Sequence, residues 1–520
     1  MEKFSLTTAI DYVNGEPHIG HAFEKILTDI ISRHYKKRAD KVFMLSGTDE
    51  HGIKIQKTAK TLGITPKELC DKNAGAFIET WKLLDIDYNK FIRTTDEEHK
   101  KTVQDIFEKL LNQGDIYKHK YTGLYCSGCE CFLSEKDLDE EGNCPVHGKK
   151  PDVVEEENYF FKLTKYKNAI IEHIKNNPKF IQPEFRVAEV LNQLENIEDI
   201  SVSRAKTNVE WGIEVKSDPT QVIYVWIDAL SNYITALGYD VNGNHGENFK
   251  EFWPVNYHII GKDILKFHSI YWIGILMALG VELPKGIYAH GWIMIDKNKM
   301  SKSTGNVISP KSVMEAFELD KPDALRYFMA TAAVGGRDGN YSDIDFKEKV
   351  NADLANNIGN LLNRTLNMLV KYFDGEIGEE FVNDALIDNA NKTVEEVLRL
   401  FDEVDVALAA SKIVALADEA NKYVNDNAPW ALAKEGKMTE CGKVLYSILN
   451  LMIKIALLIE PYCPNIANDM ARQLKFDINL KYSDIKPNML KTGKLISKEE
   501  IHPVFLRMDS DIAGENKKQK

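Results

Sequence analysis

The sequence predicts an α/β protein in which a doubly wound parallel-sheet (Rossmann-type) domain is split by a zinc-containing insertion and followed by an all-α helical bundle. Three observations predict this organisation. Strand and helix signals alternate through the first hundred residues, which is the rhythm of a parallel sheet with crossover helices. Paired cysteines and acidic runs interrupt that rhythm at 117–221, and apolar residues keep a helical period almost throughout from 347 onward.

Length and composition set the outer limits. A chain of 520 residues is long for a single core, which favours two to four domains. Its 44% hydrophobic and 28% charged residues are typical of a soluble globular protein. The formal net charge of −13 argues against non-specific coating of nucleic acid, although a local basic patch can still bind phosphates.

The N-terminal half begins with alternating elements. Residues 4–10 read as a buried strand, and an amphipathic helix follows that begins near His21. A second strand is predicted at 41–47 and a second helix at 53–63. We assign residues 1–116 to the first half of the catalytic-type sheet domain.

The same rhythm resumes after the insertion. Segments 221–230, 256–264 and 285–295 each combine a strand signal with a following loop or helix. Residues 222–296 are therefore predicted to complete the sheet domain, and 297–346 to form a lysine-containing loop with a linking region.

The C-terminal region is predicted to be helical over 347–510, with a frayed tail at 511–520. An apolar period of 3.6 residues persists over 394–426, which predicts two helices. The most apolar stretch, 444–461, contains Ser447, Asn450 and Lys454 and falls short of a clean span of ~20 apolar residues, so a buried helix is expected rather than a membrane segment.

Paired metal-ligand residues lie within the insertion. Cys126-x2-Cys129 and Cys144-x2-His147 have the spacing of a tetrahedral zinc knuckle. Four protein ligands would fill the coordination sphere, so one structural Zn²⁺ is predicted. The alternative is a set of scattered free thiols, with Cys131 as a spare; a reducing cytoplasm fits either arrangement.

Two motifs are suited to phosphate. Between the first strand and helix, a loop brings His18, Gly20 and His21 to a helix N-terminus, where free N–H groups favour an anion. A second motif places Lys299 and Lys302 in a Ser- and Gly-containing loop. Taken alone, paired histidines are more often a cap and a surface residue, and a lysine run is more often solvated surface.

Together, "HIGH" and "KMSKS" in the two halves of a split sheet resemble the signature pair of the class I aminoacyl-tRNA synthetases. That resemblance implies that Lys299 and Lys302 close over the pyrophosphate of ATP while His18 and His21 hold the transition-state phosphate. Amino-acid activation involves little covalent work by the protein, so catalysis is mainly positioning and charge stabilisation.

Further segments resemble the methionyl-tRNA synthetase family along nearly the whole chain: "AIDYVNGEPHIGH", "GTDEHG", "VWIDAL", "IIGKDILKFH" and "HGWIMIDKNKMSKSTGN". A carboxylate at the end of a strand can hold an α-ammonium group, and aromatic rings favour a thioether. The methionine-binding residues implied by the resemblance are Ile10, Tyr12, Asp49, Trp226, Ala229, Leu230, Tyr233, Ile264 and His268. The ATP-binding residues implied are His18, Gly20, His21, His290, Gly291, Lys299 and Lys302. Asp11 and Leu230 depart from many relatives, which affects the expected pocket shape.

The helical region carries a candidate tRNA-binding set. Asn360 and Arg364 are four residues apart and share a helix face, and Trp430 follows Pro429 at an expected helix start. The resemblance implies that these residues read the CAU anticodon of initiator and elongator tRNA, by base stacking and by contacts to base edges. Without it, they would be an ordinary interhelical contact and a core residue.

The resulting expectation is a cytoplasmic, monomeric methionine–tRNA ligase that uses ATP with Mg²⁺, with a helical anticodon-binding domain. Three other functions are alternatives to this expectation. A synthetase of the Leu/Ile/Val/Cys group would carry a large editing domain between the motifs. A non-catalytic tRNA-binding paralogue would have damaged phosphate motifs. A small-molecule nucleotidyl transferase would lack the long helical region.

Overall fold

The structure is a computed structural model that describes residues 2–126, 131–133, 138–145, 148–295 and 307–508. Predicted site residues outside these ranges are Cys129, His147, Lys299 and Lys302, and the tail 511–520 lies outside them as well.

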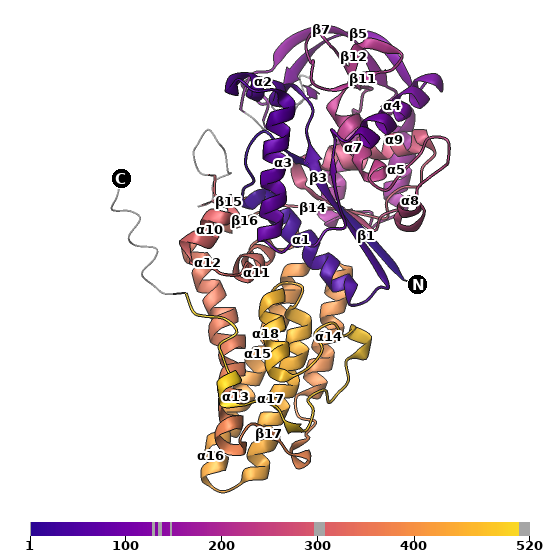
Figure 1. The fold of residues 1–520 in the computed structure, drawn as a ribbon. Coiled ribbons are helices and arrows are strands. Elements are labelled where there is room, and N and C mark those ends of the chain that lie inside the picture. The colour runs from indigo at the N-terminus through magenta and orange to yellow at the C-terminus, as the bar shows by residue number, and fades with distance from the viewer. Residues whose placement is uncertain (1, 127–130, 134–137, 146–147, 296–306, 509–520) are drawn as a thin grey trace.

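A seven-stranded parallel sheet forms the core of the first domain (Figure 1). Its strands are β1 (Lys3–Thr8), β2 (Asp11–Tyr12), β3 (Lys41–Asp49), β4 (Lys90–Arg93), β8 (Ile181–Gln182), β13 (Tyr257–Gly261) and β14 (Ile287–His290). The order is β2-β3-β1-β13-β14-β8, with β4 also paired to β3. Because β1 lies between β3 and β13, strands from the two halves of the sequence close into one sheet, which confirms the predicted split domain.

Helices cover this sheet on both sides. They include α1 (Ile19–Lys36), α2 (Ile53–Leu62), α3 (Pro66–Leu83), α4 (Glu97–Asn112), α7 (Val225–Thr235), α8 (Glu247–Phe252) and α9 (Ile273–Leu279). The predicted first helix is confirmed and begins at Ile19, because His18 caps it and turns the chain from an extended to a helical backbone. The strand order reverses at β1, and sheets of this kind usually bind ligands at such a point, outside the carboxyl ends of the strands.

The insertion is a separate antiparallel unit at one end of the molecule (Figure 1). One sheet consists of β5 (Ile116–Cys126), β6 (Cys131–Leu133), β7 (Asp152–Phe161) and β9 (Ile200–Ser201). A smaller sheet consists of β10 (Ser203–Ala205), β11 (Ile213–Val215) and β12 (Asp218–Ile223). Helices α5 (Lys167–Asn176) and α6 (Val187–Glu195) come from the same stretch of sequence but pack beside α9 of the sheet domain.

Two segments differ from the predicted boundaries of this insertion. The strand expected at 221–230 is the end of β12, which pairs antiparallel in the small sheet and not in the main one. Conversely, β8 comes from within the predicted insertion but joins the edge of the main sheet beside β14. The local sequence indicates an extended backbone in each case, but the strand partner is chosen by distant segments.

A linking region connects the sheet domain to the bundle. It contains β15 (Ile293–Ile295), α10 (Pro310–Ala316), α11 (Asp323–Ala332), β16 (Gly339–Tyr341) and α12 (Asp343–Val350). Strands β15 and β16 pair in parallel, so the segment after β14 and the segment before α12 lie side by side.

The bundle follows as predicted. Its elements are the π-helical segment η6 (Asn351–Gly359), α13 (Asn360–Phe373), α14 (Ile387–Asp402), α15 (Val406–Asn427), α16 (Pro429–Lys434), α17 (Met438–Ile459) and α18 (Pro464–Leu474). The two helices expected over 394–426 are α14 and α15, separated where Val404 takes a positive φ of 58°. Helix α17 is long and apolar enough to cross a membrane, but 94% of its most apolar window is buried inside the protein, which agrees with the predicted buried helix.

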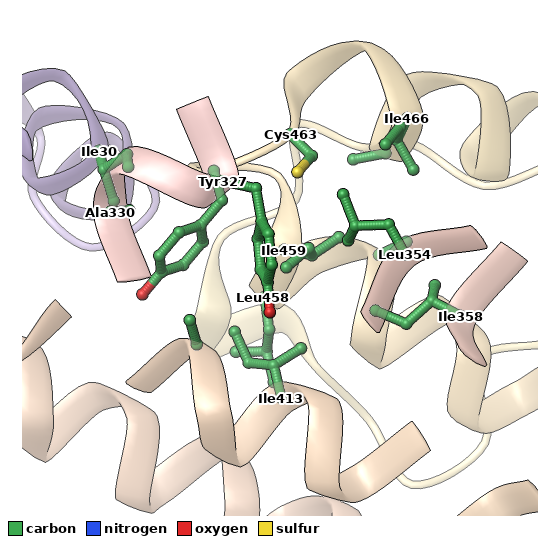
Figure 2. Close-up of a cluster of buried hydrophobic side chains, with 14 of the residues drawn as sticks. Ile30, Tyr327, Ala330, Leu354, Ile358, Ile413, Leu458, Ile459, Cys463 and Ile466 are labelled. Carbon is green, nitrogen blue, oxygen red and sulfur yellow. The ribbon is translucent and has the colours of Figure 1, made fainter. Parts of the chain in front are cut away.

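The sheet domain and the bundle share one hydrophobic core. A single cluster of buried side chains runs from β1 and α1 through α11 into α15 and α17. Figure 2 shows part of it, where Ile30 of α1 lies beside Ala330 of α11 and Leu458 of α17 lies near Ile413 of α15. The two parts therefore form one continuously packed body.

Candidate active site

The two predicted histidines occupy the first turn of α1. The Nδ1 atom of His18 accepts a hydrogen bond from the Gly20 amide at 3.1 Å, and the His18 amide donates to Nδ1 of His21 at 3.2 Å. Their rings stack with centroids 3.7 Å apart. Because each Nδ1 accepts a bond, the proton of a neutral ring lies on Nε2. An imidazole N–H at a helix N-terminus is a group that can donate to an anion.

Predicted residues from several strands meet at the same sheet edge. Asp49 ends β3 and is paired in register with Tyr12 of β2, whose hydroxyl donates to the His51 carbonyl at 2.8 Å. His290 ends β14. The carboxyl ends of parallel strands face one crevice, so this arrangement brings a buried carboxylate, an aromatic ring and an imidazole to the side on which α1 begins.

The predicted methionine pocket contains a buried Tyr–His pair. The Tyr233 hydroxyl lies 2.6 Å from Nε2 of His268, and Nδ1 of His268 lies 2.9 Å from the Ile264 carbonyl. Burial lowers the pKa of His268 to about 4, so the ring is neutral at physiological pH. Since Nδ1 donates to the carbonyl, Nε2 accepts from Tyr233, and both rings are fixed in orientation.

An aromatic stack forms another wall of this pocket. Trp226, in the first turn of α7, stacks on Phe267 with ring centroids 3.5 Å apart and an interplanar angle of 6°. Ala229 and Leu230 are buried on the same helix, while Ile10 is only half-buried. Phe267 was not among the predicted pocket residues, although its sequence position next to His268 was a usable signal.

Asp228 holds α7 in place and was not among the residues predicted from the sequence. Its carboxylate is fully buried and lies 2.7 Å from Nδ1 of His51 and 2.8 Å from Nε2 of His99. The two imidazoles hold the pKa of Asp228 below its usual range despite burial. This contact joins α7, α4 and the loop after β3, and so fixes the helix that carries Trp226.

A buried charged cluster lies beneath both sides of the site and was also missed. Lys25 of α1 is bound at 2.9 Å by the carboxylates of Asp11 and Glu24. The second oxygen of Glu24 lies 3.0 Å from Nε2 of His290. No sequence pattern indicated this cluster, because charges on a helix are usually solvated and the burial of α1 depends on its tertiary neighbours.

Glycine is required directly after β14. A Cβ added to Gly291 would come within 2.3 Å of the main chain of Arg337, so β14 and the loop before β16 pass too closely for a side chain. Beside them, Lys262 pairs with Asp338 at 2.7 Å and covers the Trp292 ring. The neighbouring Asp263 accepts a hydrogen bond from the Trp292 indole at 3.1 Å.

Comparison with known proteins places the chain in a family. The family model described as tRNA synthetases class I (M) matches residues 4–150 and 135–366, and the anticodon binding domain of methionyl tRNA ligase matches residues 374–506. The chain belongs to the methionyl-tRNA synthetase family. This confirms the resemblance drawn from the sequence motifs.

Individual methionyl-tRNA synthetases agree with this assignment. Methionine–tRNA ligases of Clostridium tetani and Clostridium perfringens are 42% and 43% identical over 98% of this chain, which spans 79% and 78% of their lengths. A solved Mycobacterium tuberculosis methionyl-tRNA synthetase in complex with methionyl-adenylate superposes with a TM-score of 0.92 at 36% identity, over 98% of this chain and all of that one.

The candidate anticodon residues of this methionyl-tRNA synthetase lie in the bundle. Asn360 is exposed at the start of α13, and Arg364 one turn later is half-buried and donates to Asn421 at 2.9 Å. Trp430 is 46% exposed in the first turn of α16, at the end of the bundle farthest from the main sheet (Figure 1). An indole so exposed is available for stacking, whereas Arg364 is partly engaged within the protein.

The predicted zinc site is described only in part. Cys126 at the end of β5 and Cys144 are both buried, and Cys144 lies in a tight turn in which its carbonyl accepts from the Gly148 amide at 2.8 Å. Buried thiols at the ends of turns fit a structural metal site. Within the described ranges, no group of three or more His, Cys, Asp or Glu side chains converges, and the other two candidate ligands lie outside them.

Proposed function

We propose that the chain is a methionine–tRNA ligase. The reaction joins a carboxylate oxygen of methionine to the α-phosphorus of ATP and releases pyrophosphate. A hydroxyl of the 3'-terminal ribose of the tRNA then attacks the methionyl carbonyl and releases AMP. The observation that carries the proposal is the meeting of the α1 histidines, Asp49 and the Tyr233–His268 pair at one sheet edge, in a chain of this family.

The pocket is suited to methionine at each end of the amino acid. The Asp49 carboxylate would hold the α-ammonium group as an ion pair. The thioether would lie against Trp226, Tyr233 and the neutral His268, because sulfur makes favourable contacts with aromatic rings. A neutral, hydrogen-bonded His268 adds no charge to a pocket for an uncharged side chain. The remaining proposed contacts are Ile10, Tyr12, Ala229, Leu230 and Ile264.

The nucleotide would occupy the other side of the crevice. Gly20, His290 and Gly291 would accommodate the adenosine, and Nε2–H groups of His18 and His21 would donate to the α-phosphate as negative charge shifts towards pyrophosphate. Lys299 and Lys302 would neutralise the leaving group. Each such donor is worth about 3 kcal/mol by comparison with oxyanion-hole groups. Magnesium, when bound with ATP, would supply positive charge that offsets the negative charge of the phosphates.

The bundle would select the tRNA. We infer that Trp430 stacks on an unpaired base and that Asn360 and Arg364 contact base edges of a CAU anticodon, on both initiator and elongator tRNA. One Zn²⁺ would be held by Cys126, Cys129, Cys144 and His147 and would stabilise the inserted module. We propose that the enzyme acts as a cytoplasmic monomer, with functional segments at 1–116, 117–221, 222–296, 297–346 and 347–510.

Amino-acid-dependent ATP–pyrophosphate exchange tests the proposal. Purified protein with magnesium is expected to exchange label with methionine and not with leucine, isoleucine, valine or cysteine. Aminoacylation of a CAU-anticodon transcript, with the same transcript carrying another anticodon as control, then tests the tRNA assignment. Exchange with a different amino acid would overturn the pocket assignment, and folded protein without any exchange would overturn the enzymatic function.

Stoichiometric metal content and thermal unfolding test the zinc site. We expect about one zinc per chain, lost together with part of the stability of the inserted module in a Cys144→Ser variant. Retention of metal by this variant would exclude the proposed ligand set.

A further inference from the structure

Lys25 is completely buried in the middle of α1 with all of its hydrogen-bonding capacity used. Its ammonium group donates at 2.9 Å to the carbonyl of Ala9, to the Asp11 carboxylate and to the Glu24 carboxylate. An ammonium has three N–H donors, so three acceptors satisfy it. The geometry therefore fixes the direction of the side chain as well as its charge.

One end of this cluster reaches the methionine side. Asp11 lies between Ile10 and Tyr12, two of the proposed methionine contacts, and β2 pairs its Asp11 with Thr48 of β3. Lys25 holds both the Ala9 carbonyl and the Asp11 side chain. Lys25 therefore binds the start of the segment that carries Ile10 and Tyr12 to α1, while pairing with β3 holds the opposite edge of this segment.

The other end reaches the nucleotide side. Glu24 uses one carboxylate oxygen for Lys25 and the other for Nε2 of His290, at 3.0 Å. Lys25 also lies one helical turn after His21, on the same face of α1. A continuous set of short polar contacts thus runs from the Ile10–Tyr12 segment to both elements proposed to hold ATP.

Stability alone does not account for such a cluster. Removing charges from water is costly, and well-packed apolar residues of similar volume stabilise a core as well or better than a buried ion pair. Burial, and then the negative charge of Glu24, raise the pKa of Tyr233 in the proposed methionine pocket. Burial raises the pKa of Asp11 to about 7, although Lys25 acts in the opposite direction.

We propose that Lys25 is a positioning residue that couples the methionine and ATP sites, through Asp11 on one side and through Glu24 and His290 on the other. Occupation of His290 and the α1 N-terminus by nucleotide fixes Glu24 and Lys25, and these fix the segment that carries Ile10 and Tyr12. Methionine consequently binds more tightly when nucleotide is present. This inference rests on the proposed function.

Three variants separate coupling from a purely structural role. Lys25→Met removes all three hydrogen bonds of the ammonium group and leaves the carboxylates of Asp11 and Glu24 without their cation. Asp11→Asn with Lys25→Met removes the Asp11–Lys25 pair together, and Glu24 keeps its contact with His290. Asp11→Asn alone keeps the Lys25–Glu24 pair and serves if the double variant does not fold. Lys454→Met is the matched control, because Lys454 is equally buried but bonds to the Pro487 carbonyl in the bundle.

The measurement is the dissociation constant of methionine, by equilibrium dialysis, without and with a non-hydrolysable ATP analogue. Wild type and Lys454→Met should bind methionine at least fivefold more tightly with the analogue, within the usual range of site coupling. The double variant should lose this enhancement, to less than twofold, and its kcat/KM for exchange should fall about 100-fold, as expected for loss of positioning. Asp11→Asn should lose part of the enhancement.

Two results would overturn the inference. One is a folded double variant, or Asp11→Asn in its place, that retains the full wild-type enhancement. The other is a wild-type enzyme that exchanges pyrophosphate with methionine but shows no enhancement. Absence of exchange in wild type is a different outcome, since it refutes the proposed function itself.

Discussion

Replacement of Arg326 by methionine should loosen the junction between the sheet domain and the bundle. Arg326 lies on α11 with no exposed surface, and its guanidinium is 2.6 Å from the carboxylate of Asp29 on α1. It also donates to the carbonyls of Leu84 at 3.0 Å, Pro461 at 2.8 Å and Tyr462 at 3.1 Å. One side chain thus joins α1, the end of α3 and the turn between α17 and α18.

The cost follows from what remains after the change. Breaking a buried ion pair from one side typically costs 3–5 kcal/mol, because the other charge is left uncompensated. Asp29 keeps Arg33 at 2.8 Å and the Asp87 amide at 2.9 Å, which favours the lower end, about 3 kcal/mol. The urea concentration at the unfolding midpoint should fall accordingly, by less than about 1.5 M, because the urea slope of a chain of 520 residues exceeds the roughly 2 kcal/mol/M of small proteins.

Two activity measurements show whether Arg326 positions the bundle or only stabilises the core. Methionine-dependent exchange requires only the sheet domain, whereas aminoacylation requires the bundle to hold the tRNA in register with the site. For Arg326→Met we expect exchange within about threefold of wild type and aminoacylation reduced roughly tenfold or more, as misplacement of a substrate by about 1 Å can cost 100-fold.

A surface arginine provides the control. Arg399 on α14 is mostly exposed and pairs with Glu403 at 2.8 Å, so Arg399→Met should change stability by no more than about 0.5 kcal/mol. The reasoning would be refuted if Arg326→Met unfolded at the wild-type urea concentration. Equal loss of exchange and aminoacylation would also refute it.

Three further predictions concern the proposed site. The pKa of His268 is lowered by burial from its ordinary value of 6.5 to about 4, so its contribution to stability is present above pH 6.5 and is lost as pH falls towards 4, where the unfolded chain binds the proton first. Asp11, beside two proposed methionine contacts, has a pKa raised by burial to about 7, so the titration is made in the Asp11→Asn variant. In that variant methionine affinity should stay constant from pH 8 to about 5 and decline near pH 4, and a decline centred near 6.5 would contradict the reasoning. His21→Asn should lower the exchange rate by about 10²–10³ with methionine affinity unchanged, and a variant that instead lost methionine binding would show that His21 has a different role. Trp430→Ala should raise the free-energy barrier of aminoacylation by about 1–3 kcal/mol while pyrophosphate exchange stays at the wild-type rate. Aminoacylation at the wild-type rate in this variant would exclude stacking of a base on Trp430.

Local patterns accounted for most elements of the fold. The period of apolar residues predicted α14 and α15 as separate helices because amphipathicity is written in each segment itself. Strand pairing is not local, and for that reason β12 was expected in the wrong sheet and β8 in the insertion. The π-helical segment η6 had no distinguishing sequence pattern at all.

The candidate site was predictable where residue type alone signals chemistry. His18 and His21 were located from their motif, and the structure adds the stacking and capping that orient them. Glu24, Lys25 and Asp29 were not singled out, since charges on a helix are usually solvated and only the tertiary structure shows that α1 is buried on all sides. Buried ionic contacts of this kind depend on partners such as Arg326, far away in the chain.

Helix α1 also has a mechanical consequence. Its first turn carries the two histidines proposed to bind phosphate, and at its other end Tyr35 and Arg38 bind Asp402 while Lys37 binds the carbonyl of Ile478. Eighteen residues at 1.5 Å per residue give a rigid helix of about 27 Å between these histidines and the bundle. With both ends of α1 anchored, the distance between the histidines and the bundle is fixed. We therefore expect the RNA, rather than the protein, to bend when a bound tRNA does not match that distance.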